Sequence, residues 1–192
     1  MRRSTSALGV LLVVAGLTGG CSTVDPSRFA CRERDNLSAL ILAAQAVPTA
    51  TLLPCLDTLL TGWRFAGSEI VDGSARFWLA SDRAGMRAVR VELLPDCDVT
   101  SAVEVPPSAD EAGTRRFESP ISLEPSFAAD RFYTFPGGCV KVEFRFGVSD
   151  PRLVLEADQA LSFRPRAELV ERLQDLGLIL CGAGAAACPG GG

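Results

Sequence analysis

The sequence predicts a single α+β domain, in which an antiparallel sheet of about five to seven strands carries N-terminal and C-terminal helices on one face and is stapled by disulfides. Three observations predict this class. Apolar residues recur with a helical period over residues 37–47, alternate with polar residues in several runs within 63–146, and regain a helical period after residue 150. A helix, a run of strands and further helices follow one another in that order, which is typical of α+β domains.

The first twenty residues have the composition of an export signal. Arg2 and Arg3 precede an uncharged apolar run from Ala7 to Thr18. About twelve helical residues reach roughly 18 Å, which is short of the ~30 Å hydrocarbon core of a bilayer. We therefore expect residues 1–20 to be a cleaved signal peptide, with an uncleaved membrane anchor as an alternative.

Cys21 stands directly after the small residues Thr18, Gly19 and Gly20. This junction resembles the lipobox of bacterial lipoprotein precursors, in which an apolar run ends in small residues before a cysteine. It departs from that pattern in having Thr18 where leucine, valine, isoleucine or alanine is usual, and the resemblance covers residues 1–21 only. It implies that the Cys21 thiol receives a diacylglycerol and becomes the new N-terminus. Plain secretion, with Cys21 as a free or paired thiol, is the alternative.

Two or more acyl chains on Cys21 would hold the protein stably at a membrane without crossing it, and we expect it on the extracytoplasmic face. Residues 21–30 would then be the lipidated cysteine and a polar tether, and residues 31–180 the domain. Residues 181–192 are rich in glycine and alanine and have little apolar surface, so we expect them to form a frayed tail.

The first helix is expected over residues 37–47, between a cap at Asp35 and a stop at Pro48. Its apolar face consists of Leu37, Leu40, Ile41, Ala44 and Val47.

A β-hairpin is expected next, because Asp72-Gly73 lies between two apolar stretches. A two-residue turn at this position pairs Glu69 with Arg76 and Gly67 with Trp78. An ion pair and an aromatic side chain over a glycine are both favourable cross-strand neighbours.

Further strands are expected at residues 89–93, 99–105, 117–123, 131–135 and 140–146. A turn at Pro136-Gly137-Gly138 joins the last two, and residues 106–113 form an exposed loop rich in prolines and acids. Helices follow over residues 150–161, capped by Asp150, and over residues 164–177, where Gly177 marks the stop. The apolar face of the last helix consists of Leu169, Leu173 and Leu176.

Seven cysteines leave one unpaired in an exported protein, and lipidation of Cys21 removes this imbalance. The other six can pair in fifteen ways. Local geometry favours Cys31 with Cys55, Cys97 with Cys139, and Cys181 with Cys188. Because no close C-x-x-C pair is present, a metal site is not expected.

Composition excludes several functions. The chain has no histidine, which removes Ser-His-Asp and Cys-His catalysis and a His-ligated zinc. Without Arg2 and Arg3, 17 basic residues face 23 acidic ones, a net charge near −6. An acidic domain repels phosphate backbones, so nucleic acid is not an expected partner. No cofactor is predicted.

Trp63, Phe65 and Trp78 share one face of the predicted hairpin. A helix can bury this aromatic set, or the set can form a binding patch for a protein or a small apolar ligand. The sequence therefore predicts a membrane-anchored lipoprotein that acts as a binding or structural module at the cell envelope. The alternative is a small envelope hydrolase that uses two paired carboxylates.

Overall fold

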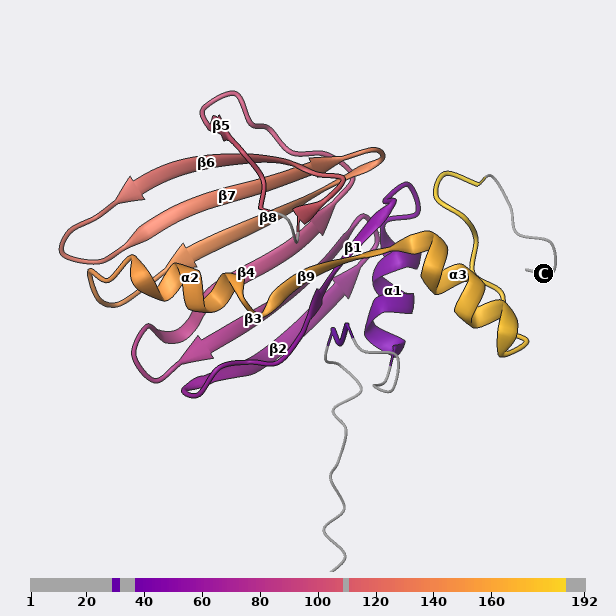
Figure 1. Cartoon of the computed structure of the whole chain (residues 1–192), viewed down its shortest axis with the longest axis horizontal. Coiled ribbons are helices and arrows are strands. Elements are labelled where there is room, and N and C mark those ends of the chain that lie inside the picture. Colours follow the sequence, from indigo (N-terminus) through magenta and orange to yellow (C-terminus); the bar gives the residue numbers. More distant parts are fainter. Residues whose placement is uncertain (1–28, 32–36, 109–110, 186–192) are drawn as a thin grey trace, which may run out of the picture.

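The computed structural model describes residues 29–31, 37–108 and 111–185. Its main element is a seven-stranded antiparallel sheet with the strand order β2-β3-β4-β8-β7-β6-β5 (Figure 1). The strands are β2 (Trp63–Val71), β3 (Ser74–Ser81), β4 (Gly85–Leu94), β5 (Val103–Val105), β6 (Arg115–Ser122), β7 (Ala128–Phe135) and β8 (Gly138–Arg145). A two-stranded sheet pairs β1 (Leu52–Leu56) with β9 (Leu161–Pro165). The helices are α1 (Ser38–Ala46), α2 (Arg152–Asp158) and α3 (Arg166–Asp175).

One face of the large sheet, here called the inner face, forms the core. Its buried side chains from β3, β4 and β8 are Phe77, Leu79, Val89, Val91, Leu93, Val140, Val142 and Phe144. The three helices and the β1–β9 pair join the same core through Leu40, Leu53, Leu153 and Leu169. The predicted α+β class, with helices on one face of an antiparallel sheet, is confirmed.

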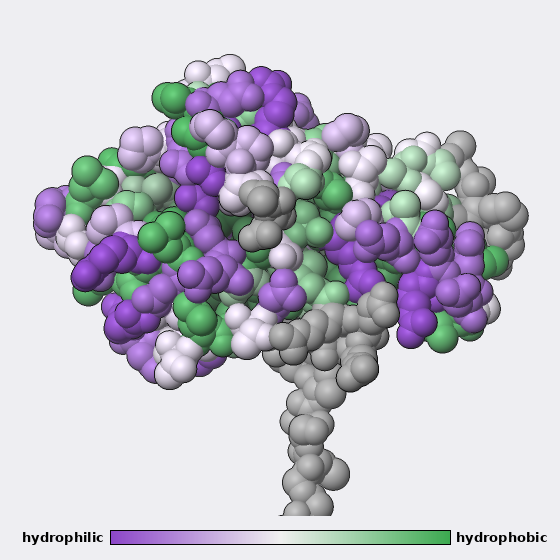
Figure 2. Space-filling model, in the orientation of Figure 1, coloured by the Kyte–Doolittle hydropathy of each residue, from purple (hydrophilic) through white to green (hydrophobic). Residues whose placement is uncertain are grey.

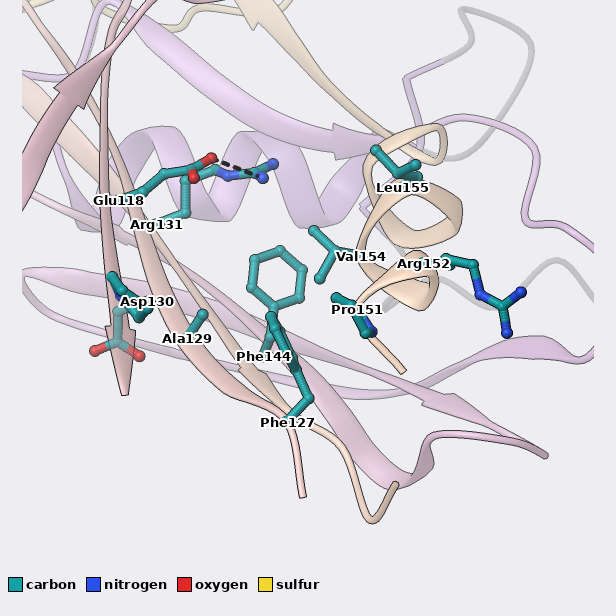
Figure 3. Close-up of a pocket in the computed structure, with 11 residues that line it drawn as sticks. Glu118, Phe127, Ala129, Asp130, Arg131, Phe144, Pro151, Arg152, Val154 and Leu155 are labelled. Atoms are coloured by element: carbon teal, nitrogen blue, oxygen red, sulfur yellow. Dashed lines mark ion pairs between the residues drawn. The ribbon is translucent and has the colours of Figure 1, made fainter. Parts of the chain in front are cut away.

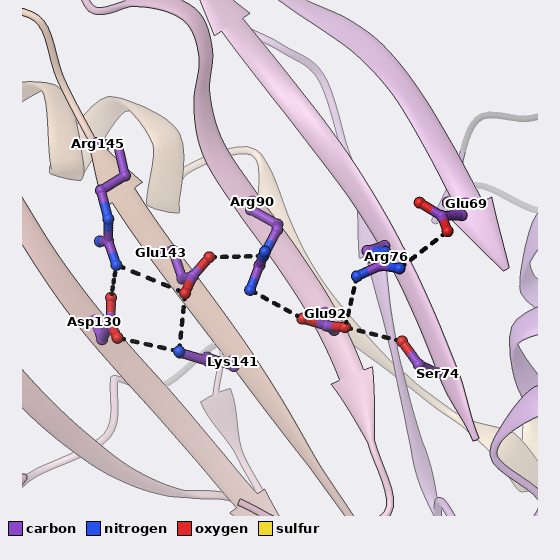
Figure 4. Close-up of polar contacts among 9 residues, drawn as sticks. All are labelled: Glu69, Ser74, Arg76, Arg90, Glu92, Asp130, Lys141, Glu143 and Arg145. Atoms are coloured by element: carbon purple, nitrogen blue, oxygen red, sulfur yellow. Dashed lines mark hydrogen bonds and ion pairs between the residues drawn. The ribbon is translucent and has the colours of Figure 1, made fainter. Parts of the chain in front are cut away.

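The opposite, outer face carries a row of alternating charges that runs across five strands (Figure 4). Its members are Glu69, Arg76, Glu92, Arg90, Glu143, Lys141, Asp130 and Arg145. The Arg90 Nε lies 2.6 Å from Glu143 Oε2, and the Arg76 Nη2 lies 3.0 Å from Glu69 Oε1. The four carboxylates and four cations compensate one another. The pair of Glu69 with Arg76 is the more exposed one and contributes about 0–1 kcal/mol, whereas the side chains of Glu92, Glu143 and Asp130 are only 11–14% exposed.

The predicted β2–β3 hairpin is present with the expected register, because Glu69 pairs with Arg76 and Gly67 with Trp78. The register then shifts between Phe65 and Gly67, so that Phe65 pairs with Leu79. This β-bulge changes which face of the sheet the start of β2 presents.

The β7–β8 hairpin also forms at the expected place, with Phe135 opposite Gly138. The predicted strand over residues 99–105 is shorter, since only Val103–Val105 pairs, and the strand expected at 117–123 is β6. In the predicted exposed loop 106–113, Glu111 is in fact buried.

The β1–β9 pair was not predicted. The helix expected over residues 150–161 ends at Asp158, and Leu161 begins β9, which pairs with β1 more than 100 residues earlier in the chain. Helix α1 covers the predicted segment, whereas its predicted cap at Asp35 lies outside the described residues. In the last helix Leu169 and Leu173 are buried as predicted, but Leu176 is 57% exposed because α3 ends one residue before it.

Two of the three predicted disulfides are present, Cys31–Cys55 and Cys97–Cys139. The second attaches the loop after β4 to the outer face, where Cys139 contacts a small cluster with Phe117 and Phe132. Cys181 is also disulfide-bonded. Cys188 and Cys21 lie outside the described residues, so the third pairing and the lipidation stay predictions.

Both ends of the described chain are part of the domain. Phe29 is fully buried with its ring 4.8 Å from that of Phe77, and Ala30 bridges to Leu56, so these two residues of the predicted tether 21–30 pack on the domain. At the other end, the Gly184 N–H donates to the Pro48 carbonyl. The first residues of the predicted tail therefore pack on the domain.

Candidate ligand-binding cleft between α2 and the sheet

A cleft of about 480 Å³ lies between α2 and the inner face of the sheet. Its walls are mainly apolar, with Pro151, Val154 and Leu155 on the α2 side and Pro120, Phe127, Ala129 and Phe144 on the sheet side. Figure 3 shows Val154 and Pro151 directed toward the Phe144 ring. In Figure 2, hydrophobic side chains reach the surface in the left half of the molecule, where α2 crosses the sheet.

The C-terminal half of the short helix α2 is held by polar contacts. The Trp63 indole Nε1 donates a 2.8 Å hydrogen bond to Glu156 Oε2, and Arg83 binds the same oxygen. At the end of the helix, Asp158 Oδ2 accepts a 2.6 Å hydrogen bond from the Arg131 guanidinium. These contacts fix the position of the helix while the space under its middle stays open.

Five side chains form a closed polar ring at one end of the cleft: Glu111, Arg116, Glu118, Arg131 and Tyr133. We call this group the charged ring. Arg116 Nη1 lies 3.1 Å from Glu111 Oε2, and its Nε lies 3.5 Å from Glu118 Oε1. Arg131 Nη2 lies 2.9 Å from the same Glu118 oxygen, and its Nη1 donates to the Tyr133 hydroxyl at 3.2 Å. The Tyr133 hydroxyl donates to Glu111 Oε1 at 2.9 Å, which closes the ring.

The pairing of β6 with β7 builds this ring. Glu118 lies opposite Arg131 and Arg116 opposite Tyr133, so all four side chains project from the inner face. The Arg131 guanidinium also lies over the Phe144 ring, 5.4 Å from its centroid. The charged ring is thereby in direct contact with the apolar wall of the cleft.

Burial and charge displace the pKa values of Tyr133, Glu111 and the neighbouring Asp158. Burial raises the pKa of Tyr133 well above its usual value, so the phenol stays protonated and serves as a donor. Burial also acts to raise the pKa of Glu111. Hydrogen bonds from the Ser108 N–H and the Tyr133 hydroxyl, with the Arg116 charge, outweigh burial and lower that pKa. At Asp158 burial dominates and raises the pKa, despite the Arg131 charge.

A second cavity, of about 320 Å³, lies on the other side of this polar group. Glu111, Arg116, Tyr133, Asp158 and Gln159 supply its polar lining, and Leu161 and Phe163 of β9 supply apolar contacts. Leu155 lines both cavities. The two spaces are therefore neighbours, and the second has the more polar lining.

The structure does not bring Trp63, Phe65 and Trp78 together as a patch. Trp63 is only 7% exposed and Phe65 packs partly buried against the same core, because the bulge in β2 turns both toward the inner face. Trp78 lies on the outer face opposite Gly67 and Arg90, with the Arg87 guanidinium 4.9 Å from its ring centroid. The predicted shared face was wrong for this reason.

Sequence reasoning missed every member of the charged ring. One signal was available: Arg131 occupies an inward position of β7 between the apolar residues Ala129 and Tyr133. A cation at an inward strand position needs buried partners. Nothing local in the sequence identifies those partners as Glu118 and Asp158.

Among the described residues, no group of three His, Cys, Asp or Glu side chains is placed to hold a metal ion. In the same part of the chain, none of the helices has the length and apolar character needed to cross a bilayer. No protein-family model, curated protein or solved structure matches this chain.

Proposed function

We propose that this protein is a membrane-anchored extracytoplasmic lipoprotein whose domain binds a small apolar ligand in the cleft under α2. The single observation that carries the binding proposal is the cleft itself. Its volume of about 480 Å³ falls within the roughly 300–1,000 Å³ of small-molecule sites, and its walls are mostly apolar, with Glu118, Asp130, Arg131 and Arg152 as the charged lining residues. The anchor is supported by the resemblance of residues 1–21 to a lipoprotein signal.

A hydrolase that uses paired carboxylates has one observation in its favour. Glu111 and Asp158 line the same cavity, and their pKa values are displaced in opposite directions. However, the Ser108 N–H, the Tyr133 hydroxyl and Arg116 already donate to both oxygens of Glu111. A carboxylate so fully engaged is poorly placed to accept a proton from water, so we favour binding over hydrolysis.

Binding is tested with the Cys21→Ser chain, which on this proposal lacks the lipid and needs no detergent. The neutral fluorophore N-phenyl-1-naphthylamine, which brightens in apolar sites, is titrated into the protein. Ala129→Phe fills the cleft from β7 and should weaken probe binding at least tenfold. The matched control is Ala128→Phe, one residue earlier and on the opposite face of the strand, which should leave binding unchanged.

Absence of saturable binding, or equal binding by the two variants, would show that the cleft is not the site. Turnover of chromogenic glycosides that disappears in Glu111→Gln would support the hydrolase instead. The anchor has its own test: metabolic labelling with a palmitate analogue should mark the wild-type chain, and labelling that persists in Cys21→Ala would contradict lipidation of this residue.

A further inference from the structure

The charges of the charged ring and Asp158, at the boundary between the two cavities, do not cancel. The charged ring contributes Glu111, Glu118, Arg116 and Arg131, and Asp158 is attached to it through Arg131. Three carboxylates therefore face two guanidinium groups, a net charge of −1 at the boundary between the two cavities. The outer face behaves differently, because its row of eight charges is balanced.

The surplus negative charge can be assigned to one end of this network. Glu111 accepts hydrogen bonds at both oxygens, and Glu118 is shared by the two arginines. Asp158 accepts only one hydrogen bond, from Arg131 Nη1 to its Oδ2 at 2.6 Å. Its Oδ1 accepts none from the described part of the chain. Glu118 also meets the arginines through one oxygen, Oε1, but two guanidinium groups share that carboxylate, whereas Asp158 has only Arg131. Asp158 is thus the carboxylate whose charge is less compensated.

The position of Asp158 connects this charge to the cleft. It is the last residue of α2, lines the 320 Å³ cavity and is followed there by Gln159, whose side chain is exposed. Leu155, one helical turn earlier, lines both cavities and is 63% exposed. A molecule that crosses Leu155 would have one end among apolar side chains and the other end beside a half-buried carboxylate.

We propose that the ligand is a cationic amphiphile, with its apolar chain in the 480 Å³ cleft and an ammonium group on Asp158 Oδ1 in the neighbouring cavity. This proposal rests on the proposed binding function and names the class of ligand. A cation removes the surplus charge at a partly buried carboxylate, whose side chain is 26% exposed, and an ion pair there is stronger than in bulk solvent. An anionic head would meet net repulsion, and a neutral head would leave the surplus charge in place.

The test compares three probes with the same twelve-carbon chain: dodecyltrimethylammonium, dodecanol and dodecanoate. Each displaces N-phenyl-1-naphthylamine from the Cys21→Ser chain. We expect the ammonium probe to bind at least tenfold more tightly than dodecanoate, with dodecanol between them. In Asp158→Asn the ratio of the ammonium and carboxylate affinities should fall to about threefold or less.

Because Asp158→Asn removes a partner of buried Arg131 and can impair folding, a second variant is needed. Gln159→Lys adds a positive charge beside the proposed head-group site without altering the network. It should weaken dodecyltrimethylammonium about tenfold and leave dodecanol unchanged. The matched control is Gln174→Lys, at an exposed position of α3, which should change neither affinity.

Two kinds of failure are distinguishable. If the neutral fluorophore and all three probes fail to bind, the proposed binding function is wrong. If the probes bind but dodecanoate equals or exceeds dodecyltrimethylammonium, or Gln159→Lys has no effect on the ammonium probe, the cleft is a binding site and the assignment of a cationic ligand is overturned.

Discussion

Replacement of Tyr133 by phenylalanine tests whether the charged ring organises the site. The hydroxyl of this single tyrosine donates to Glu111 Oε1 at 2.9 Å and accepts from Arg131 Nη1 at 3.2 Å. The residue is 1% exposed, so water cannot replace the lost group without entering the core. Phenylalanine keeps the ring contact with Phe163, whose centroid lies 4.9 Å away.

The expected cost follows from the two hydrogen bonds. Bonds to charged groups contribute roughly 1.5–3 kcal/mol each. Glu111 retains Arg116, and Arg131 retains Asp158, so neither ion is left alone and the lower value applies to each bond. Tyr133→Phe should therefore reduce the free energy of unfolding by about 3 kcal/mol.

Urea denaturation measures this change. With an m-value of about 2 kcal/mol/M, typical of a domain of this size, the midpoint should fall by about 1.5 M. Ser74→Ala is the comparison variant, because its hydroxyl also donates to a buried glutamate, Glu92, at 2.9 Å, on the outer face. That variant loses one hydrogen bond where Tyr133→Phe loses two, so it should lose about 1.5 kcal/mol.

The difference in the free energy of unfolding between wild type and Tyr133→Phe should also depend on pH. The hydroxyl is one of the groups that lower the pKa of Glu111 in the fold. A lowered carboxyl pKa stabilises the folded state above the ordinary glutamate pKa, and this stability is lost as the pH falls through the lowered value. The difference in unfolding free energy between wild type and Tyr133→Phe should therefore become smaller as the pH is lowered. If Tyr133→Phe lowers the free energy of unfolding at neutral pH by no more than Ser74→Ala does, the charged ring is not a tightly coupled unit.

Three further predictions concern the turn that supports the site, the outer disulfide and the proposed head-group position. Gly137 and Gly73 both have positive φ, but a Cβ on Gly137 would lie 2.0 Å from a backbone oxygen, whereas one on Gly73 would meet nothing within 4 Å. In thermal unfolding, Gly137→Ala should therefore reduce the free energy of unfolding by about 3 kcal/mol and Gly73→Ala by about 1 kcal/mol. Loss of the Cys97–Cys139 bond, which spans 42 positions, should cost about 4 kcal/mol in a double alanine variant compared by urea unfolding with the oxidised protein. Because burial raises the pKa of Asp158, dodecyltrimethylammonium, whose charge does not titrate, should bind more weakly as acid protonates this carboxyl, while the affinity of Asp158→Asn stays flat over the same pH range.

Local chemistry made much of the sheet predictable. The β2–β3 turn at Asp72-Gly73 and the β7–β8 turn at Pro136-Gly137 each fix a two-strand register with residues adjacent in the chain. Alternation of apolar and polar residues then assigns the faces. The bulge near Ala66 is the point where this reasoning fails, because one inserted residue reverses the faces before it and the sequence does not mark it.

Pairings between distant segments were not predictable in the same way. β1 and β9 are joined only through the fold, with Cys55 opposite Ser162, and each strand alone is too short to show a clear period. The helical pattern that predicted a helix to residue 161 extended it too far, since α2 ends at Asp158 and Leu161 begins β9. Tertiary pairing decided the outcome there.

The site depends most strongly on such distant pairings. Glu111 comes from a loop, Arg116 and Glu118 from β6, Arg131 from β7 and Asp158 from α2. Each is an ordinary charged residue in its own segment, and most charged residues of the chain are solvated surface groups. What distinguishes these five is that the fold gathers them into one partly buried network next to an apolar space, with one negative charge in excess. A protein that needed only stability would gain little from that arrangement, since buried ion pairs rarely stabilise more than well-packed apolar side chains do. The desolvation cost of these five charged side chains is therefore better explained by recognition of a ligand than by folding.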